Sequence, residues 1–297
     1  MFCVLEDKNK NIWFGGKGGL CKYNGSSYTV YGAAEGLTIP SVFCLYEDTK
    51  GDIWIGTAGG GVCKYSNGKI QSLIISDKIK NDLIYDIIED RHGNIWIASE
   101  HGLIKYDGST YSFFTEKEGL STNNVQSLCE DYEGNLWIGT INGGACILKN
   151  EAIVTYTDKD GLTSNKISAV LQDKWGNYLI GTSGRGIDIY NKNGITHLNI
   201  KELNDANIQT IDEDALGRIY VGMDGLKILE YVNGNYQLSN SLTNYFGNSI
   251  TSNQTVIKIF NDKHLCTWVA TYGNGLYRFH GGSTTHYTDS SGLPTKN

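Results

Sequence analysis

Pairs of adjacent acidic residues are the first feature of this sequence that could do chemistry. Two neighbouring carboxylates can serve general acid–base catalysis. Four such pairs follow one another along the chain: Glu6-Asp7, Glu47-Asp48, Glu89-Asp90 and Glu130-Asp131. Each pair leads into a tight turn, where an aspartate accepts hydrogen bonds from backbone N–H groups. Because a feature repeated in register does not define one active site, we interpret the pairs as turn caps.

Charged residues that interrupt the repeat are better candidates for a binding site. A ligand-binding site is a local environment that occurs once in the molecule, and residues repeated in every blade cannot form one. Arg185 lies between Gly184 and Gly186 and could offer a planar guanidinium to carboxylate or hydroxyl groups. Glu100 and His101 add a carboxylate and an imidazole, the pair that an enzyme would use. These residues fall two repeats away from Arg185, so the sequence predicts a binding protein rather than an enzyme.

Other chemical motifs do not occur in the sequence. The glycine clusters Gly18-Gly19 and Gly59-Gly60-Gly61 lack the following helix and the lysine of a phosphate-binding loop, and we interpret them as hairpin turns. The six histidines have no metal-ligand spacing. No Gly-x-Ser-x-Gly nucleophile motif is present. The sequence therefore predicts no catalytic residue, no bound metal and no cofactor.

Composition and charge narrow the class of protein. A hydrophobic content of 40% with 37 glycines and 2 prolines is typical of a globular chain with many tight turns. The formal net charge of −7 argues against a nucleic-acid partner. No apolar run is long enough to enter a membrane, and the N-terminus lacks the features of a signal peptide. We interpret the seven cysteines as small apolar core residues.

A repeated segment positions all of these residues. Its clearest copies are Gly51–Thr57 (GDIWIGT), Gly93–Ser99 (GNIWIAS) and Gly134–Thr140 (GNLWIGT). The residue in the tryptophan position is Trp13, Trp54, Trp96, Trp137, Leu179, Tyr220 and Trp268. The spacings are 41, 42, 41, 42, 41 and 48 residues, a period that predicts a repeat architecture.

Each repeat contains four short extended segments joined by tight turns, which is the connectivity of a propeller blade. The sequence therefore predicts an all-β, seven-bladed β-propeller with four antiparallel strands per blade, in a ring closed without strand exchange. Residues 1–297 form one domain in this prediction. The predicted blades are approximately 1–41, 42–83, 84–124, 125–166, 167–207, 208–255 and 256–297. The residues in the tryptophan position should be buried between neighbouring blades.

In such a propeller the turns between second and third strands share one face with the interblade connectors. We expect a ligand site on this face, where the turns differ from blade to blade. The predicted binding residues in these turns are Lys17, Glu100, His101, Asn142, Arg185, Asp224, Tyr272 and Asn274. A merely solvated loop face is the alternative for each of them.

The 48-residue step marks a second irregular place. Its extra residues fall in the connector Ser239–Thr255, which carries Tyr245 and Phe246 among polar residues. A long loop with exposed aromatic rings could stack on a sugar or dock a partner. Irregular packing at the end of the repeat array is the alternative interpretation.

The combination of Asp-Gly-Leu connectors, Glu-Asp pairs, Gly-Asn-Ile-Trp-Ile-Gly-Thr and Gly-Gly-Leu-x-Lys-Tyr resembles the two-component regulator propeller repeat. Such repeats form the sensor portion of many bacterial hybrid histidine kinases, often those that respond to carbohydrates. The resemblance implies an extracytoplasmic or periplasmic sensor domain in signal transduction; the absence of a signal peptide also leaves a cytoplasmic location open. Streptogramin lyases share the seven-bladed shape and are a more distant likeness.

Three functions follow from these observations. The leading one is a non-catalytic sensor propeller that binds a small molecule or carbohydrate. The first alternative is a protein-interaction scaffold that docks a second propeller or a signalling module. The second alternative is an enzyme of the propeller lyase or glycosidase kind. We expect no nucleic-acid partner and no membrane insertion by this chain.

Overall fold

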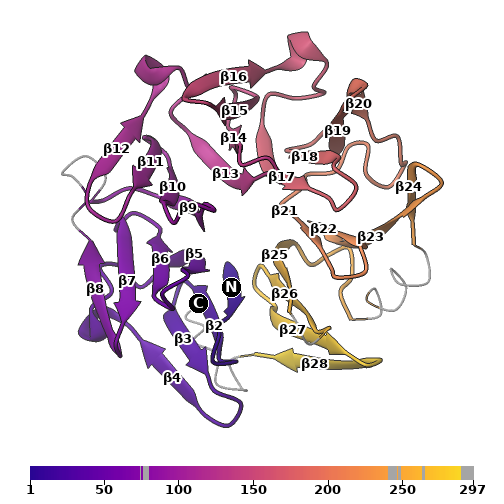
Figure 1. The fold of residues 1–297 in the computed structure, drawn as a ribbon. Coiled ribbons are helices and arrows are strands. Elements are labelled where there is room, and N and C mark those ends of the chain that lie inside the picture. Colours follow the sequence, from indigo (N-terminus) through magenta and orange to yellow (C-terminus); the bar gives the residue numbers. More distant parts are fainter. Residues whose placement is uncertain (74, 76–79, 240–245, 247–248, 263–264, 289–297) are drawn as a thin grey trace. The chain divides into compact units, whose positions relative to one another are not determined.

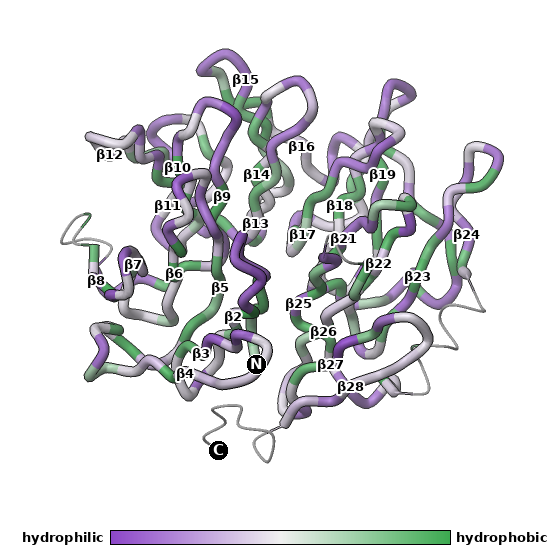
Figure 2. The backbone as a smooth tube through the Cα atoms, turned by 60° about the horizontal axis from the view of Figure 1, so that its bottom comes forward, coloured by the Kyte–Doolittle hydropathy of each residue, from purple (hydrophilic) through white to green (hydrophobic). Residues whose placement is uncertain are grey.

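The computed structural model describes residues 1–73, 75, 80–239, 246, 249–262 and 265–288. These residues form seven four-stranded antiparallel sheets, each built from four consecutive strands (Figure 1). No strand of a described sheet comes from another blade, so the predicted seven-bladed propeller without strand exchange is confirmed. Figure 2 shows that hydrophobic residues lie mostly along the strands. Among the described residues, no helix is long and apolar enough to cross a bilayer.

The chain divides into two compact units, Met1–Leu128 with Tyr287–Asn297, and Cys129–His286. The first three blades lie in the first unit. Their strands are β1 (Cys3–Glu6), β2 (Ile12–Gly16), β3 (Gly19–Tyr23), β4 (Tyr28–Tyr31), β5 (Val42–Glu47), β6 (Ile53–Thr57), β7 (Val62–Ser66), β8 (Lys69–Leu73), β9 (Ile84–Glu89), β10 (Ile95–Ser99), β11 (Gly102–Tyr106) and β12 (Tyr111–Phe114).

The last four blades lie in the second unit, except for the first residues of β13 and the last residue of β28. Their strands are β13 (Val125–Glu130), β14 (Leu136–Thr140), β15 (Ala145–Lys149), β16 (Ala152–Tyr156), β17 (Ile167–Gln172), β18 (Tyr178–Thr182), β19 (Ile187–Asn191), β20 (Gly194–His197), β21 (Thr210–Glu213), β22 (Ile219–Met223), β23 (Gly225–Val232), β24 (Asn235–Leu238), β25 (Val256–Asn261), β26 (Thr267–Thr271), β27 (Gly275–His280) and β28 (Ser283–Tyr287). One-turn 3-10 helices lie in three connectors: η1 (Ala33–Glu35), η2 (Glu116–Glu118) and η3 (Asp158–Asp160).

The tryptophan position is buried in every blade, as predicted. The exposed fractions run from 0% for Trp13 and Leu179 to 5% for Trp96. Trp13 packs in one cluster with Val42 and Ile53, which belong to the next blade. Burial of a large aromatic side chain between two sheets stabilises the fold strongly. The repeat of this position along the sequence therefore marks where each blade packs on the next.

The aspartates of the acidic pairs close the turns between first and second strands, as predicted. In the second blade, Asp48 Oδ1 accepts from the backbone N–H groups of Lys50 and Asp52 at 3.0 and 2.9 Å. Its Oδ2 accepts from the indole N–H of Trp54 at 2.9 Å, a contact that the sequence analysis did not predict. The same carboxylate thus caps the turn and satisfies the buried indole.

The glutamates of these pairs join neighbouring blades. Glu47 accepts from the backbone N–H of Lys8 in the preceding blade, at 2.9 and 3.1 Å. Glu89 accepts in the same way from Thr49, at 2.7 Å. The pairs Glu47-Asp48 and Glu89-Asp90 therefore each have two structural tasks, a turn cap and a contact between blades.

A glycine of the repeat lets the blades approach closely. A Cβ atom built on Gly56 of β6 would lie 2.7 Å from Cγ2 of Ile84, at the start of the next blade. The same relation joins Gly181 to Ile208 in the second unit, at 2.7 Å. Only a glycine fits at these points without movement of the neighbouring strand.

The turns between second and third strands are tied to the connector that follows the same blade. Isolated bridges join Ala58 to Leu83, Ser183 to Asn207, and Asp224 to Thr255. A turn glycine also donates its N–H to the connector carbonyl one position earlier, as Gly61 does to Asp82 at 3.2 Å. In each of these blades the variable turn and its connector therefore form one local surface, as the sequence analysis expected.

Candidate functional site

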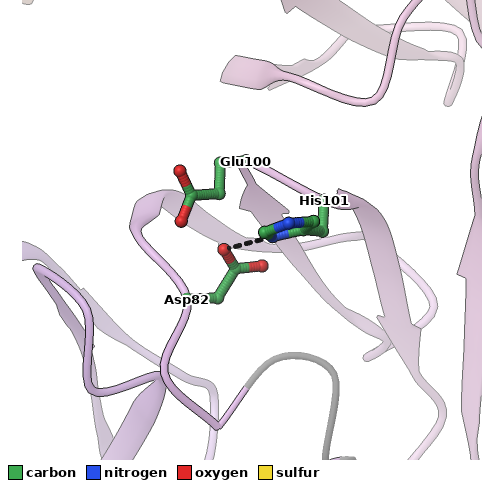
Figure 3. Close-up of side chains that lie close together, drawn as sticks. All are labelled: Asp82, Glu100 and His101. Atoms are coloured by element: carbon green, nitrogen blue, oxygen red, sulfur yellow. Dashed lines mark hydrogen bonds and ion pairs between the residues drawn. The ribbon is translucent and has the colours of Figure 1, made fainter.

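Asp82, Glu100 and His101 form the clearest cluster of functional side chains in the structure (Figure 3). Asp82 lies at the end of the connector that precedes β9. Glu100 and His101 form the turn between β10 and β11 of the same blade. One carboxylate oxygen from each acid and one imidazole nitrogen all lie within 4.8 Å of one another. The three side chains face each other from two segments of the first unit.

Hydrogen bonds hold the cluster together. The imidazole Nδ1 of His101 and Oδ1 of Asp82 are 2.8 Å apart. The backbone N–H of Leu83 donates both to Oδ1 of Asp82, at 3.1 Å, and to Oε1 of Glu100, at 3.4 Å. One backbone donor thus contacts both carboxylates, which brings the two negative groups close together.

The backbone of the cluster is fixed on both sides. The carbonyl of Asp82 accepts from the N–H groups of Gly59 and Gly61, at 3.1 and 3.2 Å. The N–H of Glu100 donates to the carbonyl of Leu83 at 3.3 Å. Because these contacts anchor both segments to the sheets, the cluster is formed in advance of any ligand.

Asp82 has an unusual surrounding for a carboxylate. Its residue exposure is 1%, and its Oδ2 atom has no hydrogen-bond partner among the described residues. His101, in contrast, has a side chain that is 64% exposed. The cluster therefore combines a buried anion with an imidazole that reaches solvent.

The charge of the acids acts on His101. The hydrogen bond that His101 donates to Asp82 raises the pKa of His101 above its ordinary value, against a smaller opposing effect of burial. The charges of Asp82 and Glu100 raise this pKa further. The protonated imidazole is thus favoured near neutral pH relative to an isolated histidine. Two carboxylates and an imidazole can exchange protons or hold a cation, and the cluster is suited to both.

The structure places Arg185 on an exposed turn of the second unit. Its guanidinium is 65% exposed and lies 3.8 Å from Asp205, which is itself 88% exposed. Flanking Gly184 and Gly186 both have positive φ, 86° and 69°. The turn therefore projects the side chain outward and leaves its donors accessible to a ligand, in agreement with the sequence analysis.

The other residues predicted from the variable turns are each placed on their own turn. The structure shows all five of the following as exposed: Lys17, Asn142, Asp224, Tyr272 and Asn274. Asp224 Oδ1 accepts from Thr255 Oγ1 at 2.6 Å, and the Asn274 carbonyl lies 2.6 Å from His286 Nε2. Glu100 and His101 are the two predicted residues that the structure brings into one cluster.

The expectation of exposed aromatic rings in the long connector is wrong for Phe246. Phe246 is 4% exposed. Its ring packs against Phe279 and Tyr220, with centroid distances of 4.4 and 5.8 Å. The side chain serves the core between the last two blades of the chain, because burying its apolar area stabilises the fold more than exposing it would. Tyr245 lies outside the described residues.

Asp82 is the member of this candidate cluster that the sequence analysis did not identify. The equivalent connector positions hold Asn123 and Asn165, whose Oδ1 atoms accept from the backbone N–H groups of Glu116 and Asp158 at 2.9 and 2.8 Å. An aspartate in an asparagine position of the repeat was the available signal. This substitution suggests a site only when Asp82 is seen in contact with His101, which is 19 residues later in the sequence.

Comparisons with solved structures show the fold in other proteins. The extracellular domain of a candidate hybrid two component system from B. thetaiotaomicron matches with a TM-score of 0.76 and 23% identity, over 94% of this chain and 38% of that one. A second such extracellular domain from the same organism matches with a TM-score of 0.64 and 18% identity, over 97% and 48%. This chain thus spans less than half the length of these two proteins.

An enzyme of the same shape is also similar. A catalytically inactive variant of virginiamycin B lyase from Staphylococcus aureus, in complex with quinupristin, matches with a TM-score of 0.70 and 14% identity, over 90% of both chains. Identities this low show a common fold and nothing about activity. No curated protein sequence is significantly similar to the chain.

The family comparison agrees with the repeat. The model of the two component regulator propeller matches residues 36–59, 78–101 and 119–142. Each matched segment runs from an interblade connector through the first two strands of a blade to the variable turn. The resemblance predicted from the sequence is confirmed, because these three segments match the two component regulator propeller repeat.

Proposed function

We propose that this chain is a non-catalytic sensor propeller of a two-component-type regulator, and that it binds a small molecule or a glycan outside the cytoplasm. Residues 1–297 act as one domain in this proposal. The matched repeats support it, as do the extracellular domains of two component systems that share the fold. The observation that carries it is the variable turn of Arg185.

Arg185 has the properties of a ligand-binding residue rather than a structural one. Its one described ion pair, to Asp205, is long and lies between two exposed side chains, so it contributes little to stability. A guanidinium presents a planar set of donors that fits carboxylate or vicinal hydroxyl groups. The proposal therefore assigns it the contact that orients an acidic or hydroxyl-rich ligand.

A binding screen with a matched control tests this assignment. The full chain is screened by thermal shift against sugars, sugar acids and small carboxylates, and hits are measured by calorimetry. Arg185→Ala should weaken binding of a hit at least about 10-fold, the loss of roughly 1.4 kcal/mol, with an unchanged melting temperature. Lys149→Ala is the control, because Lys149 is similarly exposed (56%) with a loose partner, Glu133, at 3.7 Å. Equal losses in both variants, or none in Arg185→Ala, would remove Arg185 from the site.

The same samples test the absence of catalysis. The lyase that shares the fold was solved with quinupristin, so quinupristin is the natural substrate to offer. We expect no turnover, since the proposed function is non-catalytic. Turnover that is lost in His101→Gln would contradict the sensor assignment and favour the enzyme.

A protein-interaction scaffold is the second candidate function. In the second unit the turns between first and second strands carry large exposed apolar side chains. These are Tyr132 (63% exposed), Trp175 (42%), Leu216 (62%) and Leu265 (66%). The corresponding turns of the first unit carry polar and charged residues instead, among them Lys8, Thr49 and Arg91. Exposed apolar groups at equivalent places favour a docking surface.

The occupant that we propose for this surface is a second propeller. In the two proteins with the same fold described above, more than half of the chain lies beyond the matched part, which leaves room for one. A second copy of this chain is the available probe. Sedimentation velocity should show concentration-dependent dimers that disappear when Tyr132, Trp175 and Leu216 are replaced by serine. A wild-type chain that stays monomeric at high concentration would count against the scaffold.

A further inference from the structure

We propose that Asp82, Glu100 and His101 bind a divalent transition-metal ion. This site lies in the first unit, apart from the turn of Arg185, and does not depend on the proposed sensor function. The sequence analysis expected no metal, because the spacing of the histidines matches no known motif. The structure joins one histidine to two acids from a separate segment of the chain (Figure 3).

The donor set suits such an ion. Carboxylate oxygens and an imidazole nitrogen together bind first-row divalent metals, whereas calcium and magnesium prefer oxygen alone. Two donors bound to one ion at about 2.1 Å are at most about 4.2 Å apart. The three donors here lie within 4.8 Å of one another before any ion is bound. Small rotations of the Glu100 and His101 side chains suffice to close the remaining difference.

The types of donor also indicate which ions to test. Imidazole nitrogen suits nickel, and carboxylate oxygen suits manganese. Mn²⁺ and Ni²⁺ are therefore the probes for this site.

The buried carboxylate of Asp82 is the independent sign that a ligand is missing. Its Oδ2 atom is buried and makes no hydrogen bond, although such atoms are satisfied in most proteins. The carboxyl group is turned toward Glu100 and His101 (Figure 3). A bound cation would satisfy this charge and would neutralise the neighbouring glutamate as well.

Equivalent positions in other blades show that the carboxylate is not needed for folding. Asn165 occupies the position of Asp82 in a later connector, and its side chain caps that connector through Asp158. Gln254 occupies it before the last blade, where its side chain bonds to the Thr251 N–H and the Tyr277 hydroxyl. In both places the side chain makes hydrogen bonds to nearby residues. Asp82 alone of these three keeps an oxygen atom without a hydrogen bond.

Access to the site is open on one side. The imidazole of His101 is 64% exposed, so an ion bound to it would keep positions for water or for an oxygen-containing ligand. The side that faces the protein is rigid, because Gly59 and Gly61 hold the backbone of Asp82. A rigid inner side and an open outer side are typical of a metal that binds further ligands.

The test measures binding of Mn²⁺ and Ni²⁺ to the full chain after dialysis against EDTA. Calorimetry should show one ion per chain, and pulsed paramagnetic resonance of the Mn²⁺ form should show the nitrogen of one imidazole. Asp82→Asn and His101→Gln should weaken binding at least 10-fold to 100-fold, with loss of the nitrogen signal in His101→Gln. His92→Gln is the matched control and should bind as the wild type does, because His92 is an exposed histidine of the same blade.

Two results would overturn the proposal. One is binding of much less than one ion per chain. The other is equal affinity in the wild type, Asp82→Asn and His101→Gln, which would mean that exposed histidines bind metal without a built site. Folding is checked from the melting temperature in EDTA, and Asp82→Asn introduces the residue found at Asn123 and Asn165. If that variant unfolds, Glu100→Gln with His101→Gln gives the same test.

Discussion

The bond between Asp90 and Trp96 allows the packing of the blades to be tested quantitatively. The indole N–H donates to Asp90 Oδ2 at 2.8 Å, and Trp96 is 5% exposed. Hydrogen bonds to a charged acceptor contribute about 1.5–3 kcal/mol, and truncation of the buried indole to alanine costs about 3–5 kcal/mol. Trp96→Phe keeps most of the packing and removes the donor. Asp90→Asn keeps the shape and removes the charge.

A double-mutant cycle in urea isolates the bond itself. We expect the double variant to be less destabilised than the sum of the single variants by about 1.5–3 kcal/mol, because the two changes remove the same interaction. Tryptophan fluorescence and circular dichroism should give coincident unfolding curves for the free energies to be comparable. The matched control is Asp173 with Leu179 in the fifth blade, where the leucine offers no donor and the coupling should be small.

The pH dependence of this coupling has a defined sign. Burial by itself raises the pKa of Asp90, but hydrogen bonds from Asn94 and Trp96 outweigh it and lower the pKa below the ordinary value of 3.8. A carboxylate with a lowered pKa stabilises the folded protein above its unfolded pKa and loses this effect as the pH falls through the folded value. The coupling should therefore be full at pH 7 and decline below about pH 4. A coupling under about 0.5 kcal/mol, or one that ignores pH, would refute the reasoning.

Three further predictions concern other contacts within the units. Gly56→Ala should lower the free energy of unfolding in urea by about 1–3 kcal/mol, because the new Cβ would overlap Cys44 Sγ of its own blade and Ile84 Cγ2 of the next, the latter at 2.7 Å. An unchanged value would contradict this close packing. Burial raises the pKa of Asp212 to about 6, so the cost of its charge develops from about pH 4, the unfolded pKa, and is complete above about pH 6. Asp212→Asn should therefore raise the melting temperature at pH 8, raise it less at pH 5 and leave it unchanged at pH 3. Tyr236→Phe should cost about 1–3 kcal/mol in urea, since it removes the hydroxyl donor to the buried carboxylate of Asp173, and a neutral effect would argue against that bond.

The period of one position was enough to predict the fold. Trp13, Trp54 and their counterparts are buried where the blades meet, and this remains true for Leu179 and Tyr220, which are not tryptophan. The repeat also predicted the capping role of the aspartates. It did not predict that Glu47 bonds to Lys8, because the contact joins residues of different blades and depends on how the sheets stack.

Two of the three residues in the candidate cluster stood out in the sequence. Glu100 and His101 were found because they depart from the repeat at a turn, and exposure of Arg185 followed from its two glycines. Asp82 was missed because its role requires a contact with His101 that sequence spacing does not reveal. For Phe246 the prediction of an exposed ring was wrong. The length of the connector suggested exposure, but the ring packs against Phe279 in the core.

A repeat fold gives a physical criterion for where function lies. Side chains that every blade needs, such as Asp48 with its two backbone donors and one indole, have all their bonding capacity used within the fold. A side chain that binds a ligand must have hydrogen-bonding or charged atoms that the fold itself does not use. Leaving such atoms without a partner lowers the stability of the unliganded protein. Asp82 meets this criterion with a buried oxygen that has no hydrogen bond, and Arg185 meets it with an exposed guanidinium whose ion pair is loose. Because a structural role would have satisfied both groups, they are the positions at which substitution should change binding while the blades stay folded.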